Sequence, residues 1–135
     1  MNRVAVVYWS GTGHTQAMAE AVASACSGKL MTAAEFTPDQ VAEYDAIAFG
    51  CPAMGAEELE DTEFEPMFSA CESKLSGKKI ALFGSYGWGD GEWMRTWEEN
   101  CKNDGAELVC DSVICADAPD DEADAACAAL GKALC

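Results

Sequence analysis

The fold of this chain is decided by the stretch Val4-Ala5-Val6-Val7-Tyr8-Trp9-Ser10-Gly11-Thr12-Gly13-His14-Thr15. An apolar, β-branched run ends in a short loop rich in glycine and hydroxyl groups, and a helical pattern begins at once. In such a strand–turn–helix unit, the backbone N–H groups of the first helical turn and the positive end of the helix dipole meet at one point. Gly11 and Gly13 let the backbone approach a ligand closely. Hydroxyl donors come from Ser10, Thr12 and Thr15. The stretch predicts a phosphate site, and the plain alternative is a βα turn with capping hydroxyls.

Two further loops follow apolar segments, namely Gly-Cys-Pro-Ala-Met-Gly-Ala-Glu-Glu at 50–58 and Gly-Ser-Tyr-Gly-Trp-Gly-Asp-Gly-Glu-Trp at 84–93. Because these two loops and the first one occur in this order and at this spacing, the chain resembles the short-chain flavodoxins of anaerobic bacteria. The resemblance runs from Val4 to the C-terminal helix. It implies one non-covalently bound FMN as the cofactor and a role in carrying electrons between redox partner proteins, namely reductases and ferredoxin-dependent enzymes.

Composition agrees with this interpretation. The 135 residues fit one domain, expected to cover 1–135, with one hydrophobic core. The net charge is −16, from 24 acidic against 8 basic residues. Nucleic acid and anionic membranes are therefore disfavoured as partners, whereas basic protein surfaces are favoured. The sequence contains neither an 18-residue uncharged apolar run nor a signal-peptide pattern, so we expect a cytoplasmic monomer without a membrane span.

The chain has eight cysteines but no C-x-x-C pair, and it has a single histidine. Structural zinc sites and iron–sulfur clusters usually show close cysteine spacing, so no metal site is expected. In a cytoplasmic protein most of these thiols should remain reduced and behave as small apolar side chains. Cys135 is the thiol that we expect to be exposed.

Strand and helix patterns alternate along the chain. Strands are predicted at 3–9, near 29–33, and at 45–51, 79–85 and 107–116. Helices are predicted at 14–26, 64–75, 92–104 and 121–134, with a turn or helix start at 37–40. This alternation predicts an α/β fold, a three-layer sandwich in which helices cover both faces of a parallel sheet. The resemblance selects a flavodoxin-like, five-stranded sheet of order 2-1-3-4-5, with ligands bound beyond the carboxyl ends of the strands.

The resemblance assigns the phosphate end of the FMN to the first loop. The contacts it implies are Ser10, Gly11, Thr12, Gly13 and Thr15, with Ser85 as a further hydroxyl.

His14 stands where flavodoxins commonly carry asparagine. Its side chain is either solvated or close enough to the phosphate to be charged by it.

The resemblance places the FMN ring between the other two loops. Met54 would pack on one face and Trp88 on the other, because a thioether and an indole both pack well on a flat aromatic system. Gly87 belongs to the glycine-rich loop that presents Trp88. Trp9 would flank the ribityl chain, and Asp117 stands where flavodoxins often carry asparagine near the ribityl.

Three consecutive residues carry the expected electronic tuning. By resemblance, Glu57 accepts a hydrogen bond from the flavin N3–H. The peptide after Gly55 rotates so that its carbonyl meets N5–H, and Ala56 follows at a position that varies among flavodoxins. The resemblance thus implies a low-potential, one-electron carrier whose FMN cycles between semiquinone and hydroquinone, with no substrate turnover of its own.

Six acidic residues crowd into 57–65. Such a run is usually a solvated face, and acidic residues also favour the start of a helix, here the one predicted near Phe64.

Two other function classes compete with the electron carrier. An FMN-dependent NAD(P)H:quinone reductase of the same fold would need room for a second substrate, and this chain has no segment left over for it. A phosphoacceptor receiver domain would need acidic residues at the ends of the first and third strands, where this chain has Trp9-Ser10 and Gly50-Cys51. The first loop also lacks the lysine of a nucleoside-triphosphate P-loop.

Overall fold

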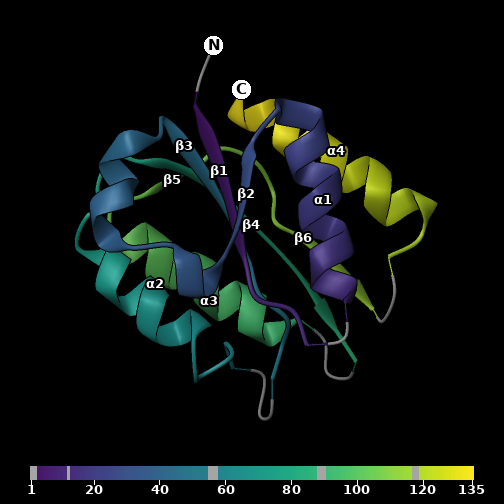
Figure 1. The fold of residues 1–135 in the computed structure, drawn as a ribbon. Helices are drawn as coiled ribbons and strands as arrows, with labels where there is room; N and C mark the ends of the chain where they lie inside the picture. The colour runs from purple at the N-terminus through teal and green to yellow at the C-terminus, as the bar shows by residue number, and fades with distance from the viewer. Residues whose placement is uncertain (1–2, 12, 55–57, 88–90, 117–118) are drawn as a thin grey trace.

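A parallel β-sheet forms the middle layer of this computed structural model (Figure 1), which describes residues 3–11, 13–54, 58–87, 91–116 and 119–135. Its strands are β1 (Val4–Tyr8), β2 (Lys29–Thr32), β3 (Ala46–Gly50), β4 (Lys79–Tyr86), β5 (Glu107–Leu108) and β6 (Val113–Ala116). The strand order is β2-β1-β3-β4-β5, and β6 also pairs with β4. All of these pairs are parallel, which confirms the predicted order and sheet type.

The last strand differs from the prediction, which was one strand over 107–116. The structure has two short strands in that place, because Leu108 and Val113 are five positions apart but pair with β4 residues only three positions apart. The extra residues leave the ladder as a bulge. Ser112 of this bulge donates a hydrogen bond of 2.6 Å to Glu98 on the neighbouring helix, which holds the excursion in place.

The helices confirm the predicted pattern. They are α1 (His14–Cys26), α2 (Phe64–Glu72), α3 (Glu92–Asn103) and α4 (Asp121–Leu134), with short 3₁₀ helices η1 (Ala33–Glu35) and η2 (Pro38–Glu43). The predicted helix start at 37–40 is the beginning of η2, where Thr37 and Gln40 form a capping box. In the described part of the chain, no helix is both long and apolar enough to cross a membrane.

Alternating strand residues build two cores, one on each face of the sheet. Val4 and Val6 of β1 pack toward α1 and α4, whereas Ala5 and Val7 pack toward α2 and α3. The two helical layers are visible on either side of the sheet (Figure 1). The two tryptophans of α3, Trp93 and Trp97, are both buried, and Trp97 meets two α2 phenylalanine rings edge-on, with centroid separations of 5.4 and 5.6 Å.

Candidate functional site

Backbone hydrogen bonds bring the three loops of the sequence analysis together at one edge of the sheet. Trp9 N donates to Gly50 O at 3.1 Å, which joins the ends of β1 and β3. Ala53 N donates to Ser85 O at 3.0 Å, which joins the second loop to the end of β4. Residues far apart in sequence are therefore neighbours, because the carboxyl ends of parallel strands lie at the same edge.

A cavity of about 230 Å³ lies at this edge, and we name it the strand-end pocket. Its lining consists of Trp9, Gly11, His14, Pro52, Ala53, Met54, Ser85, Tyr86 and Gly87. Six of these are site residues expected from the sequence; Pro52, Ala53 and Tyr86 are not. The sequence could have indicated these three residues as well, since all of them lie within the two glycine-containing loops that follow β3 and β4. His14 lines the pocket half-buried, at the first position of α1.

The start of α1 presents backbone donors toward the first loop. Gly13 is its N-cap, with φ at +95°, a conformation that glycine adopts without steric cost. Its N–H donates to Ser10 Oγ at 3.0 Å, and the first intrahelical bond runs from Ala17 N to Gly13 O. The amides of the first turn therefore point out of the helix toward the loop. That turn contains no acidic residue, whereas α2, α3 and α4 each carry at least one. The positive end of the α1 dipole is left available to an anion.

Two hydroxyls beside this turn form a buried pair. Thr15 on α1 is 1 % exposed, Ser85 on β4 is 4 % exposed, and their oxygens lie 2.9 Å apart. In a hydroxyl pair one group donates to the other, and the acceptor keeps its own proton for a third partner. Because Ser85 also lines the pocket, the pair can offer a donor to a ligand there.

The second loop is closed by a short backbone bridge. Met54 N donates to Glu58 O at 2.8 Å, and Glu58 N donates to Met54 O at 2.9 Å. The Met54 side chain lines the pocket and is 38 % exposed, high for a large apolar side chain. A ligand ring packed on it would cover this apolar surface. Several expected site residues lie outside the described residues: Thr12, Gly55, Ala56, Glu57, Trp88 and Asp117.

Trp9 is held in the pocket wall by a contact that sequence reasoning did not find. Its indole Nε1–H donates to Glu63 Oε1 at 3.2 Å. Glu63 is the N-cap residue of α2, so the bond links the pocket to the acidic segment. No local pattern indicates this pair, since its members are 54 positions apart.

The solvated face expected for the acidic run is wrong for one of its members. Glu60 is only 3 % exposed. Its carboxylate accepts hydrogen bonds from Glu63 N at 2.8 Å and Phe64 N at 2.9 Å, and from both the backbone and the hydroxyl of Thr62. Burial alone would raise the Glu60 pKa, but these bonds outweigh it and the pKa is lowered. The Glu60 N–H donates to Cys51 Sγ at 3.3 Å, which ties the start of α2 to the residue that follows β3.

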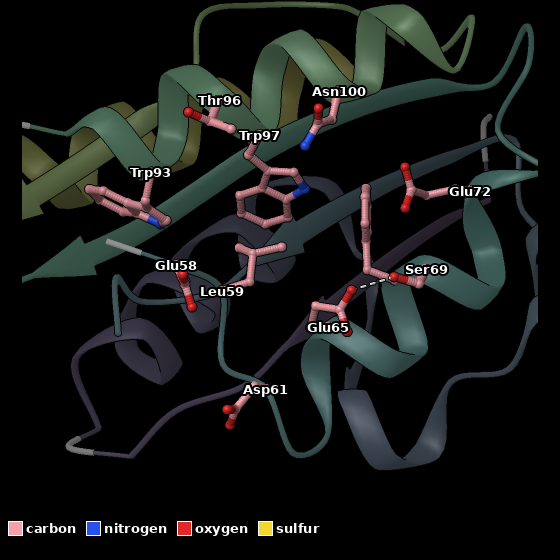
Figure 2. A pocket seen from close by; sticks show the side chains of 11 residues that line it. Glu58, Leu59, Asp61, Glu65, Ser69, Glu72, Trp93, Thr96, Trp97 and Asn100 are labelled. Carbon is pink, nitrogen blue, oxygen red and sulfur yellow. Dashed lines mark hydrogen bonds between the residues drawn. The ribbon is translucent and has the colours of Figure 1, made fainter. Parts of the chain in front are cut away.

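A second cavity lies between α2 and α3 and measures about 410 Å³; we name it the α2–α3 hollow (Figure 2). Its lining consists of Glu58, Leu59, Asp61, Glu65, Phe68, Ser69, Glu72, Trp93, Thr96, Trp97 and Asn100. Four of these are acidic and none is basic, so this hollow repels a phosphate despite its larger volume. Its rim begins at Glu58, where the bridge of the second loop ends.

Comparisons with known proteins agree with this geometry. The family model described as "Flavodoxin" matches residues 6–130. The chain is 44% identical over 135 residues to the flavodoxin of Megasphaera elsdenii, with 96% of each chain covered. It is 45% identical over 134 residues to the flavodoxin of Clostridium beijerinckii, again with 96% of each covered. The solution structure of the two-electron reduced Megasphaera elsdenii flavodoxin matches with a TM-score of 0.89 and 43% identity, covering 97% of both chains.

Proposed function

We propose, since this chain belongs to the flavodoxin family of FMN-binding electron carriers, that its FMN binds in the strand-end pocket. Flavodoxins are not enzymes, and they pass electrons to redox partner proteins. The matches do not favour the quinone-reductase alternative. Bound FMN supplies the redox chemistry, and the protein supplies position, charge and exclusion of water.

The FMN phosphate is assigned to the N-terminus of α1, and the main support for this position is the absence of acidic residues there. In a chain with 24 acidic residues, the first turn of α1 has none and points at a loop of small and hydroxyl residues. Ser10, Gly11, Gly13 and Thr15 stand on this loop and turn, and Ser85 lies across from Thr15. A phosphate placed there would receive backbone N–H donors and hydroxyl protons from two elements.

The FMN ring is assigned to the part of the pocket lined by Met54, Trp9 and Tyr86, which come from three different loops or strand ends. Met54 offers an exposed thioether, and Trp9 is oriented by its bond to Glu63. Gly87 leads into the loop that carries Trp88. A flat, largely apolar ligand suits these walls better than a sugar or a peptide would.

The remaining assignments come from the sequence resemblance alone and fall on residues outside the described parts. They are the phosphate contact of Thr12, the Trp88 ring face, the Glu57 acceptor for N3–H, the Gly55–Ala56 peptide at N5–H, and the ribityl contact of Asp117. The Met54–Glu58 bridge supports the loop assignments, because it anchors both ends of the segment that contains Gly55 and Glu57.

We further propose that redox partners dock through basic surfaces onto the acidic side chains next to the pocket. Glu58, Asp61 and Glu65 are exposed on the rim of the α2–α3 hollow, and the whole chain carries a charge of −16. Opposite charge steers encounter and orients the partner toward the nearby FMN. In this proposal the carrier docks as a monomer that consists of one domain over 1–135.

We also propose a cytoplasmic location, which the arrangement of the cysteines supports. All eight lie in the described part of the chain, and no disulfide joins any two of them there. Such cysteines persist as thiols in a reducing compartment.

Anaerobic stepwise reduction of the FMN-loaded protein, followed by visible absorbance, tests the proposed function. We expect two separate one-electron steps. Oxidation of NAD(P)H with a quinone as acceptor, catalysed by the same preparation, would support the enzymatic alternative instead. A purified protein that does not bind FMN would contradict both.

A further inference from the structure

Helices α1 and α4 approach each other closely at a glycine. A Cβ atom added to Gly131 of α4 would lie 2.5 Å from Val22 O and 3.1 Å from Ala25 Cβ, both on α1. Only a residue without a side chain permits this approach. Both helices return the chain against parallel strands, so they run in the same direction, and their C-terminal ends lie at the same end of the sheet (Figure 1).

One helical turn beyond this contact, each helix presents a cysteine. Cys26 follows Val22 by four positions, and Cys135 follows Gly131 by four. Cys26 Sγ–H donates to Val22 O at 3.2 Å, and Cys135 Sγ–H donates to Gly131 O at 3.5 Å. Each thiol is thus turned back toward the point where the helices touch.

Cys135 also lies close enough to Cys26 to act on its thiol electrostatically. Burial is the main cause that raises the pKa of Cys26, and the neighbouring thiol of Cys135 raises it further. Cys26 is 6 % exposed, whereas Cys135 is exposed to solvent. One thiol is therefore open to reagents, and the other lies behind it.

We propose that Cys26 and Cys135 form a reversible dithiol–disulfide pair that, when oxidised, fastens the C-terminal end of α4 to α1. The oxidant is a small disulfide. The exposed thiolate of Cys135 attacks one of its sulfurs, and a small thiolate leaves. Cys26 then gives up its proton, attacks the Cys135 sulfur of the mixed disulfide, and releases the second small thiol. Two protein thiols are oxidised, one small disulfide is reduced to two thiols, and the two protons end on those products.

The other cysteines are poorer candidates for this reaction. Burial raises the pKa of Cys51, Cys101 and Cys127 to about 12 and that of Cys71 to about 11. Buried thiols with such values form little thiolate and react slowly.

Cys115 also raises the pKa of Cys127, so a Cys115–Cys127 linkage is the competing product of oxidation.

The test uses the FMN-loaded full chain, incubated with oxidised glutathione, alkylated and digested for mass spectrometry. We expect one intramolecular linkage between Cys26 and Cys135, no dimer on a non-reducing gel, and reversal by dithiothreitol. The closed loop spans about 110 residues, so Tm should rise by roughly 5 °C or more on oxidation. The FMN absorbance reports that the fold is intact throughout.

Three variants make the test decisive. Cys26→Ser should keep a glutathione adduct on Cys135, because the second attack is lost. Cys135→Ser should give neither adduct nor linkage at this site. Cys110→Ser, a control at a half-buried cysteine, should oxidise like the wild type. The proposal is overturned by a Cys115–Cys127 linkage, by a dimer joined through Cys135, or by a wild-type protein that stops at the glutathione adduct.

Discussion

The strand-end pocket and the α2–α3 hollow are both lined by aromatic side chains, yet they suit opposite ligands. The pocket is the smaller, at about 230 Å³ against about 410 Å³. It lies at the acid-free N-terminus of α1, whereas the hollow is lined by four carboxylates and no base. Volume therefore does not select the phosphate site. The direction of backbone dipoles and the sign of the side-chain charges select it.

A negative charge added to each cavity in turn should distinguish them most clearly, because only the charge in the strand-end pocket should weaken FMN binding. Ser10→Asp keeps an oxygen acceptor for Gly13 N but adds a negative charge beside the proposed phosphate position. At roughly 8 Å and an effective dielectric constant of about 20, each pair of unit charges repels by about 2 kcal/mol. The Kd for FMN, measured by fluorescence titration, should rise at least ~30-fold.

The matched control is Ser69→Asp, the same substitution at an exposed position of the hollow. It should leave the Kd for FMN unchanged. Riboflavin, which lacks the phosphate, should bind the Ser10→Asp variant nearly as well as the wild type. If FMN and riboflavin weaken equally, the first loop does not hold the phosphate.

Glu60 is buried at the start of α2, and Glu60→Gln should show how strongly its carboxylate stabilises the folded chain. The amide removes the charge from an acceptor of several hydrogen bonds at the start of α2, which costs about 1–2 kcal/mol in the free energy of unfolding. Urea denaturation measures this loss. Glu65→Gln, at an exposed acid of the hollow that accepts from Ser69, should cost only a few tenths of a kcal/mol.

The same variant carries a pH signature. The pKa of Glu60 is lowered in the folded state, so its stabilisation is present above its ordinary value of 4.5 and is lost as the pH falls through the folded value. Between pH 6 and pH 3 the wild type should lose more stability than Glu60→Gln. Equal losses would mean that the Glu60 carboxylate is not specially stabilised.

The acids of the hollow should also act on the pocket at a distance. Changing Glu58, Asp61 and Glu65 to their amides removes three negative charges from the rim. At about 12 Å in water each unit charge contributes roughly 0.35 kcal/mol, so the lower midpoint potential of bound FMN should rise by up to ~45 mV at low salt. Potentiometric titration at two ionic strengths checks this, since salt screens the effect.

The same triple variant tests the docking proposal. Its electron transfer to a basic haem protein such as cytochrome c should be slower than that of the wild type at low salt. Amide substitution of the exposed Glu20, Glu43 and Glu107 removes the same charge away from the pocket edge and serves as the control. A control that changes the rate and the potential as much would show that net charge alone is responsible.

The smallest effect is expected at the far end of the hollow, where Glu72 lies beside Asp104. Burial is the main cause that raises the Glu72 pKa from 4.5 to about 7, and the neighbouring carboxylates of Asp104 and Glu65 raise it further. The folded state therefore retains a proton that the unfolded state releases between those values, and stability falls as the pH rises through this window. Glu72→Gln should flatten this fall by up to ~1 kcal/mol in urea denaturation at pH 5 and pH 8. If the free energy of unfolding of Glu72→Gln falls between pH 5 and pH 8 as steeply as that of the wild type, Glu72 does not cause the fall.

Local sequence patterns predicted correctly those structural features that depend on residues close together in the sequence. The run before Ser10 predicts a buried strand, the spacing of apolar residues after Gly13 predicts α1, and the order of the glycine loops predicts which strand ends meet. Such patterns failed where a partner is distant. The bulge in the last strand follows from register against β4 and from the bond between Ser112 and Glu98. No periodicity in 107–116 shows it.

The sequence alone determined the class of fold, the family resemblance and the loop expected to hold the phosphate, because periodicity and turn chemistry are local properties. Only the folded chain decided which acids are buried and which are solvated. Glu60 and its exposed neighbours are alike in sequence, but among the acids of this run that the structure describes only Glu60 is buried, with its carboxylate turned to the start of α2. The pairing of Cys26 with Cys135 is likewise tertiary, since it depends on how closely α4 approaches α1 at Gly131.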